Sequence, residues 1–248
     1  GGTMKNTAFS IVIATFALLL LWHTASVALD KAFLPTPLAS FQAFIELSKE
    51  GEMWPQFLVS AYRVLVSTLL GVALALPLGL ACGRSELLYR IASPLVAILY
   101  PLPKVVFLPI LVVLFGLGDL PKIVLITMII FFQIFVVVSD AAHQLPQESV
   151  DAMHTLTSNK WEIFRHLLLP ATLPQMLTSL RISVGTSVAV LFFAETFASF
   201  DGLGYLILDG MECRDYANMF AGIIGMALLG VLFYEIIYFI EKKFCRWL

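Results

Sequence analysis

The chain has 248 residues and a formal net charge of −2, with 60% hydrophobic and only 13% charged residues. Soluble domains carry about 25% charged residues, and a soluble globule with so few would expose large apolar patches. The same composition excludes a disordered chain, and the lack of a basic run excludes a nucleic-acid-binding module. The sequence therefore predicts an all-α membrane protein that crosses the bilayer several times.

A membrane-spanning helix needs about 20 predominantly apolar residues, and the apolar stretches of the sequence predict six spans. In chain order they cover residues 6–29, 64–83, 91–116, 123–139, 174–200 and 216–234. The third stretch contains four prolines, Pro94, Pro101, Pro103 and Pro109. Non-helical backbone at membrane depth is tolerated only beside protein or a water-filled cavity, so we expect a broken helix there.

The N-terminal part divides into three segments. Residues 1–3 precede Met4 and are interpreted as an expression scar, and residues 4–33 hold the first transmembrane helix. A cleaved signal peptide is the alternative, but the apolar stretch is longer than the apolar region of a usual signal peptide. Residues 34–56 are too polar to span the membrane. We expect an amphipathic helix on the outer surface, or else a solvated connector, because four apolar residues fall near helical spacing: Phe41, Phe44, Ile45 and Leu47.

Lysine and arginine residues predict the orientation, because short cytoplasmic loops carry an excess of them. With a cytoplasmic N-terminus, the inner segments hold eight of these residues and the outer segments hold four. The sequence therefore predicts that both the N- and C-termini are cytoplasmic.

The longest inner segment, residues 141–173, is longer than a connection between packed helices needs. A helix is expected to begin near Pro146, because proline suits a first turn and Glu148 and Asp151 suit the positive end of the helix dipole. Residues 157–159, Thr-Ser-Asn, are expected to break it. A second helical piece over residues 161–169 is expected to end at Pro170. This pattern is typical of a docking device, with a solvated loop as the alternative.

Within this segment, Asp151-Ala152-Met153, then Thr157, then Leu167-Leu168-Leu169-Pro170 stand at a distinctive spacing. It resembles the cytoplasmic-loop motif of bacterial binding-protein-dependent ABC importer permeases: E-A-A, three residues, G, nine residues, I-x-L-P. Thr157 replaces the glycine of the motif, which shifts the turn towards Asn159. In that family the loop forms a coupling helix that sits in a groove of a separate ATPase subunit. The resemblance implies that the coupling residues are Glu148, Asp151, Ala152, Met153, Thr157, Asn159, Trp161, Leu167, Leu169 and Pro170.

Other pieces between residues 34 and 247 resemble one subfamily, the nitrate, sulfonate and taurine type, which includes permeases for thiamine-precursor pyrimidines. Among them are Pro101-Leu102-Pro103-Lys104, Ala194-Glu195 and Gly202-Leu203-Gly204-Tyr205. The resemblance implies a type I ABC importer permease fold with six transmembrane helices. Residues 34–56 would be a periplasmic segment, and residues 57–248 the permease core with its cytoplasmic coupling loop at 141–173. It also implies a multi-pass homodimer in the bacterial inner membrane, two copies of a cytoplasmic ATPase subunit and a periplasmic substrate-binding protein.

The chain is expected to be a transport subunit rather than an enzyme. It contains no Gly-Lys pair, and hence no G-x-x-x-x-G-K-[ST] phosphate loop. ATP and Mg are therefore expected in the partner ATPase, and no cofactor is expected in this chain. The expected function is import of a small anionic or polar solute.

Ionisable residues inside spans are costly at the bilayer centre. Lys104 lies among prolines near mid-membrane, and we expect it either to line the translocation path or to pair with Glu195 or backbone oxygens. Glu195 is expected to serve as a gate or in helix packing, because a proton relay lacks a second carboxylate nearby in sequence. The candidates for the translocation path are Lys104, Glu195, Pro101 and Pro103. Snorkelling to the membrane interface is expected of three residues near span ends: Arg63, Arg181 and Glu235.

Two other protein classes are weaker alternatives. A secondary transporter driven by an ion gradient usually shows an internal repeat, and the sequence shows none. An intramembrane enzyme would need a catalytic or metal-binding cluster, but the histidines are scattered and form no H-E-x-x-H pattern. The cysteines lack metal-ligand spacing and are expected to be small apolar fillers: Cys82, Cys213 and Cys245. No catalytic or metal-binding residue is therefore expected.

Overall fold

The computed structural model describes residues 2–197 and 199–245, with side chains from residue 9 onwards. Every regular element among them is helical, and η2 is a π-helix. The elements are α1 (Gly2–Leu29), α2 (Pro37–Glu50), α3 (Met53–Arg84), α4 (Glu86–Leu99), η1 (Lys104–Phe107), α5 (Leu108–Phe115), α6 (Asp119–His143), α7 (Gln147–Leu156), α8 (Lys160–Ile163), η2 (Phe164–Leu168), α9 (Leu169–Phe197), α10 (Leu203–Glu212) and α11 (Tyr216–Phe244). Gly1 of the predicted expression scar and residues 246–248 of the predicted core lie outside the described residues.

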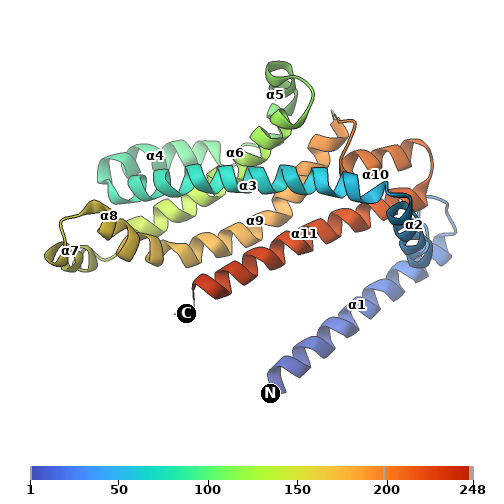
Figure 1. Cartoon of the computed structure of the whole chain (residues 1–248), viewed down its shortest axis with the longest axis horizontal. Helices are drawn as coiled ribbons and strands as arrows, with labels where there is room; N and C mark the ends of the chain where they lie inside the picture. The colour runs from blue at the N-terminus through green and yellow to red at the C-terminus, as the bar shows by residue number, and fades with distance from the viewer. Residues whose placement is uncertain (1, 198, 246–248) are drawn as a thin grey trace.

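The long helices α3, α6, α9 and α11 form an elongated bundle (Figure 1). At one end of the bundle α7 and α8 project, and at the other end lie α2 and α10. Helix α1 diverges from the bundle and meets it near α2, where Trp22 Nε1 donates to the Pro35 carbonyl at 3.0 Å. The free ends of α1 and α11 point towards the α7–α8 end, as the predicted orientation requires of two termini on one side.

Five helical stretches within the described residues are long and apolar enough to cross a membrane. The pair α4 and η1–α5 adds a sixth if it is one span, because its two halves pass the same test together and are bent by 82°. The predicted break in the third span is therefore confirmed, and counting the bent pair as one span gives the six predicted spans. The second span begins at Met53 rather than residue 64, because Arg63 is buried in the protein and does not mark a helix end.

The fifth span differs from its prediction at Pro170. The helix was expected to end there, but helical backbone continues from Lys160 to Phe197. In an α-helix, a proline ring clashes with the carbonyl four residues earlier. The π-helix η2 widens the preceding turn, and the Leu169 N–H donates to the Phe164 carbonyl. The wider turn lets the helix continue past Pro170, so α8, η2 and α9 form one continuous helical segment.

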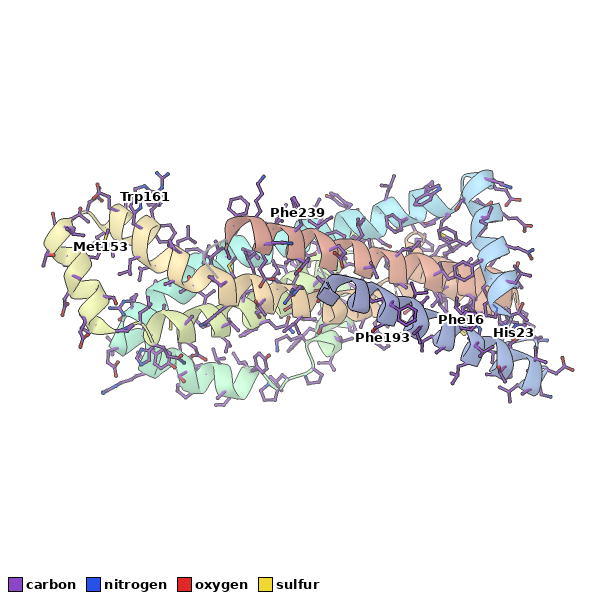
Figure 2. The ribbon with its side chains drawn as sticks, turned by 90° about the horizontal axis from the view of Figure 1, so that it is seen from below. Phe16, His23, Met153, Trp161, Phe193 and Phe239 are labelled. Carbon is purple, nitrogen blue, oxygen red and sulfur yellow. The ribbon has the colours of Figure 1, made fainter. Side chains whose placement is uncertain are left out.

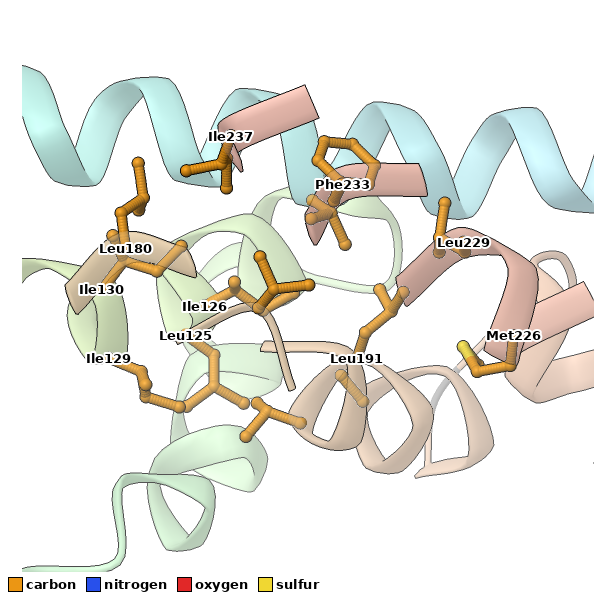
Figure 3. Packing of buried hydrophobic residues seen from close by; sticks show 14 of the residues in the cluster. Leu125, Ile126, Ile129, Ile130, Leu180, Leu191, Met226, Leu229, Phe233 and Ile237 are labelled. Carbon is orange, nitrogen blue, oxygen red and sulfur yellow. The ribbon is translucent and has the colours of Figure 1, made fainter. Parts of the chain in front are cut away.

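Helices α3 and α6 approach closely because glycines line the contact. A Cβ on Gly71 would lie 2.7 Å from Ile130 Cγ2, and one on Gly79 would lie 3.0 Å from Val138 Cγ1. Small residues at helix contacts allow such approach where lipid gives little hydrophobic driving force. The apolar core lies between α6, α9 and α11 (Figure 3), and its fully buried residues include Ile126, Leu191 and Leu229, one from each of these helices.

The predicted amphipathic helix is present as α2. Thr36 Oγ1 accepts from the Ala39 N–H at 3.3 Å, and Gly51 ends the helix with a φ of 82°. Its buried face differs from the expected one, because α2 packs on α11 through the buried residues Ser40, Ala43 and Leu47. Of the four expected apolar residues, Leu47 is buried and Phe44 is half-buried, whereas Phe41 and Ile45 stay 42% and 50% exposed.

Candidate functional site

Three regions of the molecule carry unusual chemistry, and the first is the α7–α8 end. Helix α7 ends where Thr157 takes an extended conformation. The Asn159 N–H donates to Thr157 Oγ1 at 3.1 Å, and Asn159 Oδ1 accepts from the Trp161 N–H at 3.0 Å to cap α8. The break therefore lies at the predicted residues, and side-chain hydrogen bonds hold it in place of the glycine of the motif.

This end exposes apolar side chains beyond the bundle. Leu156 is 81% exposed and Trp161 is 63% exposed, and Trp161 stacks on Phe164 at a centroid distance of 5.2 Å. Figure 2 shows Met153 and Trp161 at the extreme end of the molecule, far from Phe16 and His23 of α1. Five of the predicted coupling residues are exposed, namely Glu148, Asp151, Ala152, Asn159 and Trp161. The other five are half-buried, namely Met153, Thr157, Leu167, Leu169 and Pro170.

The second region is the bend between α4 and η1. Lys104 Nζ donates to the carbonyls of Tyr100 at 3.0 Å and Leu99 at 3.2 Å, and lies 3.4 Å from that of Leu102. Pro103 has no N–H, so it leaves the Leu99 carbonyl without its usual helical donor. The ammonium also lies 4.9 Å from the centroid of the Phe132 ring. Of the partners considered from the sequence, Lys104 therefore has backbone oxygens and not Glu195.

Three cavities adjoin this bend, and two of them are also lined by α9. One of about 250 Å³ is lined by Lys104, Phe132 and Thr186 among others. The other, of about 730 Å³, runs along α9 past Ser179. Both cavities are lined by Tyr100 and Gln133. Pro101 and Pro103 are exposed at the bend.

The third region is a buried ion cluster at the α2–α10 end. Arg63 Nη1 of α3 lies 2.7 Å from Glu195 Oε1 of α9, and Arg63 Nε donates to Asp119 Oδ1 of α6 at 2.7 Å. Arg63 Nη2 pairs with Asp201 in the loop before α10. The side chains of Arg63 and Glu195 are 1% and 0% exposed. The expected snorkelling of Arg63 is wrong, because carboxylates from three other segments satisfy its guanidinium inside the protein.

The cluster also holds the start of α10. The first N–H groups of a helix lack partners within the helix. Side chains of α3 and α9 accept three such groups: Gly202 N–H to Gln56 Oε1 at 2.6 Å, Leu203 N–H to Ser60 Oγ at 2.9 Å, and Gly204 N–H to Glu195 Oε2 at 2.8 Å. A carboxylate at this position also suits the positive end of the helix dipole. Glu195 therefore joins α9 to both α3 and α10.

Asp201 lies outside the spanning helices and is half exposed. Partial burial raises the pKa of Asp201, but hydrogen bonding and attraction from Arg63 outweigh that effect and hold the pKa below its ordinary value. The ion pair therefore favours the charged form of this carboxyl group.

Sequence reasoning missed the convergence of these charges. Asp119, Lys122 and Asp201 fall in outer loops of the predicted topology, separate from Arg63 and Glu195. Lys122 is 1% exposed, and its Nζ donates to the Gly118 carbonyl at 2.6 Å beside the cluster. All five charges lie at the outer ends of predicted spans. Comparing their expected depths in the membrane could have predicted that they lie close together.

The other two ionisable residues near span ends differ from each other. Arg181 does not reach the interface freely, because its Nη1 lies 3.3 Å from Glu241 Oε2 and its guanidinium lies over the Tyr234 and Tyr238 rings. Glu235 is exposed on α11, and its snorkelling stays a prediction. Over the described part of the chain, no three histidine, cysteine or acidic side chains come together to hold a metal ion.

Comparisons with known proteins give these regions a context. A family model described as "Binding-protein-dependent transport system inner membrane component" matches residues 75–246. The aliphatic sulfonates transport permease protein SsuC of Bacillus subtilis is 29% identical over 86% of this chain and 78% of its own length. The taurine transport system permease protein TauC of Escherichia coli is 26% identical over 96% of this chain and 90% of its own length.

Among solved structures, the MetNI methionine ABC transporter in inward-facing conformations matches with a TM-score of 0.62 and 23% identity. The match covers 79% of this chain and 97% of that chain, and it shows the fold of a type I ABC importer permease. Members of the matched family are transport components that work with an ATPase and a binding protein, so the enzyme and secondary-transporter alternatives are not favoured. Because the family model matches residues 75–246, this multi-pass membrane chain belongs to the binding-protein-dependent transport system inner membrane components, the permease subunits of ABC importers.

Proposed function

We propose that two copies of this chain and two cytoplasmic ATPase subunits import a small organic anion or similar polar solute across a bacterial inner membrane. A periplasmic binding protein would deliver the solute, and ATP and Mg would bind in the ATPase subunits. The names of SsuC and TauC, which refer to aliphatic sulfonates and taurine, support a small sulfonate as the solute class. The proposal depends most on the exposed apolar surface of the α7–α8 end.

That surface suits docking better than solvation. A tryptophan that is 63% exposed and a leucine that is 81% exposed lie on helices outside the bundle. Exposed apolar residues within a polar rim mark protein contacts, and the rim here contains Glu148 and Asp151. We propose that Leu156 and Trp161 enter the groove of the ATPase, with the other four exposed coupling residues around them.

The continuous helix supports a mechanical role. Helical backbone runs without interruption from Lys160 through η2 to Phe197, and α7 follows α6 after a short turn. A displacement of α7 and α8 by closure of the ATPase pair is therefore transmitted as a tilt of α6 and α9. Switching between inward- and outward-open states follows from the movement of packed elements against each other.

The exposed apolar faces support a dimer. Val113 and Leu114 of α5 are 84% and 67% exposed, and Ile98 of α4 is 69% exposed. We propose that the second copy covers part of this face, which places Lys104, Pro101 and Pro103 near the path between the copies. Glu195 has no exposed surface, and its contacts with Arg63 and α10 support the helix-packing role over the gate.

The docking proposal is tested with Leu156→Ser and Asp151→Lys, each expressed with the ATPase subunit that copurifies with the unsubstituted chain from native membranes. Both variants are expected to insert normally and to lose most of the copurified ATPase together with ATP-dependent taurine uptake in proteoliposomes. Leu38→Ser is the matched control, because Leu38 is 67% exposed on α2 at the opposite end. Retention of the ATPase and of transport by both variants would show that the docking surface lies elsewhere.

A further inference from the structure

We propose that the solute is recognised in a groove formed by the Tyr100–Lys104 bend, α6 and α9, and that the groove selects a small organic anion. We call it the bend groove and define it by Tyr100, Lys104, Gln133, Ser179 and Thr186. This inference rests on the proposed import function, and it assigns to named side chains the chemistry that distinguishes one solute from another.

The geometry provides two neighbouring cavities. They measure about 730 and 250 Å³ and share the lining residues Tyr100 and Gln133. Small-molecule sites typically measure about 300–1,000 Å³ and place a few polar groups in mostly apolar walls. In the bend groove the walls contain Val136, Val137 and Ile182, with hydroxyl and carboxamide groups between them. A solute with an apolar body and one polar head fits this distribution.

Gln133 is the first indication that the groove binds a polar ligand. Its Oε1 is buried and accepts no hydrogen bond, although buried polar atoms almost always have a partner. Gln133 lines both cavities, so a solute in either of them lies beside it. Rotation of the carboxamide about its last bond exchanges the oxygen and the NH₂ group, which lets the same side chain donate to an anionic head.

The charge in the groove favours an anion. Lys104 lines the smaller cavity, and the described residues provide it with backbone carbonyls and aromatic rings but no ion pair. No aspartate or glutamate lines either cavity among the described residues. An ammonium without a carboxylate in a partly buried site attracts oxyanions through charge-assisted hydrogen bonds. When a sulfonate or carboxylate head lies near Lys104, the ammonium would exchange its backbone carbonyl partners for the charged oxygens of the head.

Nearby carboxylates are already engaged outside the groove. Asp140 lines the third cavity, which shares Tyr100 and Val136 with the larger cavity, and its Oδ1 accepts from Tyr89 Oη at 3.0 Å. Glu241 accepts from Thr178 Oγ1 at 2.6 Å and lies beside Arg181. Among the described residues, neither acid forms an ion pair with Lys104.

The first test measures charge preference without relying on transport. The test uses the complete complex with Cys82, Cys213 and Cys245 replaced by serine. Thr186→Cys is introduced into this complex as the reporter thiol. It is treated either with the anionic reagent sulfonatoethyl methanethiosulfonate or with the cationic reagent trimethylammonioethyl methanethiosulfonate. The anionic reagent is itself a small organic sulfonate. Steering by Lys104 is expected to raise the ratio of its reaction rate to that of the cationic reagent about tenfold above the ratio at a control site. Thr196→Cys on the same helix is the matched control, because the cavity it lines contains no charged residue among those described.

Substitution of Lys104 sharpens the test. Lys104→Met is expected to remove the preference at Thr186→Cys, and Lys104→Arg is expected to keep it. In proteoliposomes, Lys104→Met and Gln133→Leu are expected to lower kcat/KM for taurine about tenfold, the usual effect of losing a hydrogen bond to a charged group. Lys49→Met and Gln42→Leu on α2 are the matched controls. Both are expected to transport normally, because the two residues are exposed at the end of the bundle opposite α7 and α8.

The outcomes separate this inference from the proposed function. Equal reagent ratios at Thr186→Cys and Thr196→Cys, with Lys104 present, would overturn the anion-selective groove even in a complex that transports taurine. Unchanged transport by both Lys104→Met and Gln133→Leu would overturn it as well. A strong anion preference at Thr186→Cys in a complex without ATP-dependent uptake would instead contradict the proposed function and leave the groove supported.

Discussion

Arg63 and Lys104 are both cations inside spanning segments, yet their surroundings are opposite. Arg63 contacts carboxylates of Asp119, Glu195 and Asp201 and is 1% exposed. Lys104 is half-buried, and within the described residues its hydrogen bonds go to backbone carbonyls no more than five residues away in sequence. A charge paired with carboxylates is part of the scaffold, whereas an unpaired charge beside a cavity remains available to a ligand.

The chemistry of the two side chains explains the division. A guanidinium has five N–H donors in a fixed plane, so Arg63 can bridge several segments at once. An ammonium is a compact charge with three donors and a flexible stem, which suits Lys104 to exchange one set of oxygens for another. We therefore expect large effects on stability from the ion cluster and large effects on transport from the bend groove.

The largest expected effect on stability comes from Arg63→Met. It leaves Glu195 buried without its cation, and breaking a buried ion pair from one side costs about 3–5 kcal/mol. Thermal unfolding of the detergent-purified chain should show a strongly lowered midpoint. The double variant Arg63→Met, Glu195→Gln should recover part of the loss, since it removes the orphaned charge. An unchanged midpoint in the single variant would contradict the scaffold role of the cluster.

A smaller effect is expected from Gly204→Ala. An added Cβ would lie 2.6 Å from Glu195 Cβ and 3.0 Å from the Phe192 carbonyl oxygen, and such overpacking costs about 1–3 kcal/mol. Gly185→Ala on α9 is the matched control, because nothing lies within 4 Å of the added Cβ. Comparison of the two unfolding midpoints measures how tightly α10 is held against Glu195. Equal midpoints would mean that α10 can move away from α9 with no loss of folding stability.

Asp201→Asn is expected to have a small effect that depends on pH. The pKa of Asp201 lies below its ordinary value because Arg63 outweighs partial burial, so its charged form stabilises the fold above the ordinary carboxyl pKa. The contribution is lost as pH falls through the folded-state pKa. Because Asp201 is half exposed, solvent screening should keep the effect near neutral pH to about 1 kcal/mol or less. The difference in midpoint between variant and parent should shrink on acidification, and a constant difference would exclude this ion pair as its cause.

The smallest expected effect on stability is that of Lys104→Met. Its contacts are local, so the unfolding midpoint should stay within the range of ordinary surface substitutions, about 0.5 kcal/mol. The same variant is expected to impair taurine transport, as described above. A large loss of stability would show that Lys104 serves mainly to hold the bend, and the contrast with Arg63 would disappear.

Much of the architecture could be predicted from particular residues. The apolar stretches predicted six spans, the prolines between Pro94 and Pro109 predicted the break in the third, and Thr157 and Asn159 predicted the turn between α7 and α8. The predicted end at Pro170 was wrong, because a π turn can absorb a proline that an α turn does not accept. The cap residues Thr36 and Gly51 mark the two ends of α2 in the sequence. Its packed face could not be predicted, because the contact with α11 decides which side chains are buried.

The sequence by itself determined the elements and the class of protein. A chain in lipid must satisfy its backbone polar groups internally, so long apolar stretches become helices whatever their neighbours do. Only the tertiary structure decided which charges meet, because Arg63 and Glu195 are 132 residues apart and their contact depends on how three helices pack. Glycines at Gly71 and Gly79 set the approach of α3 to α6, and that packing brings Asp119 to Arg63 while Lys104 stays without a carboxylate at the bend.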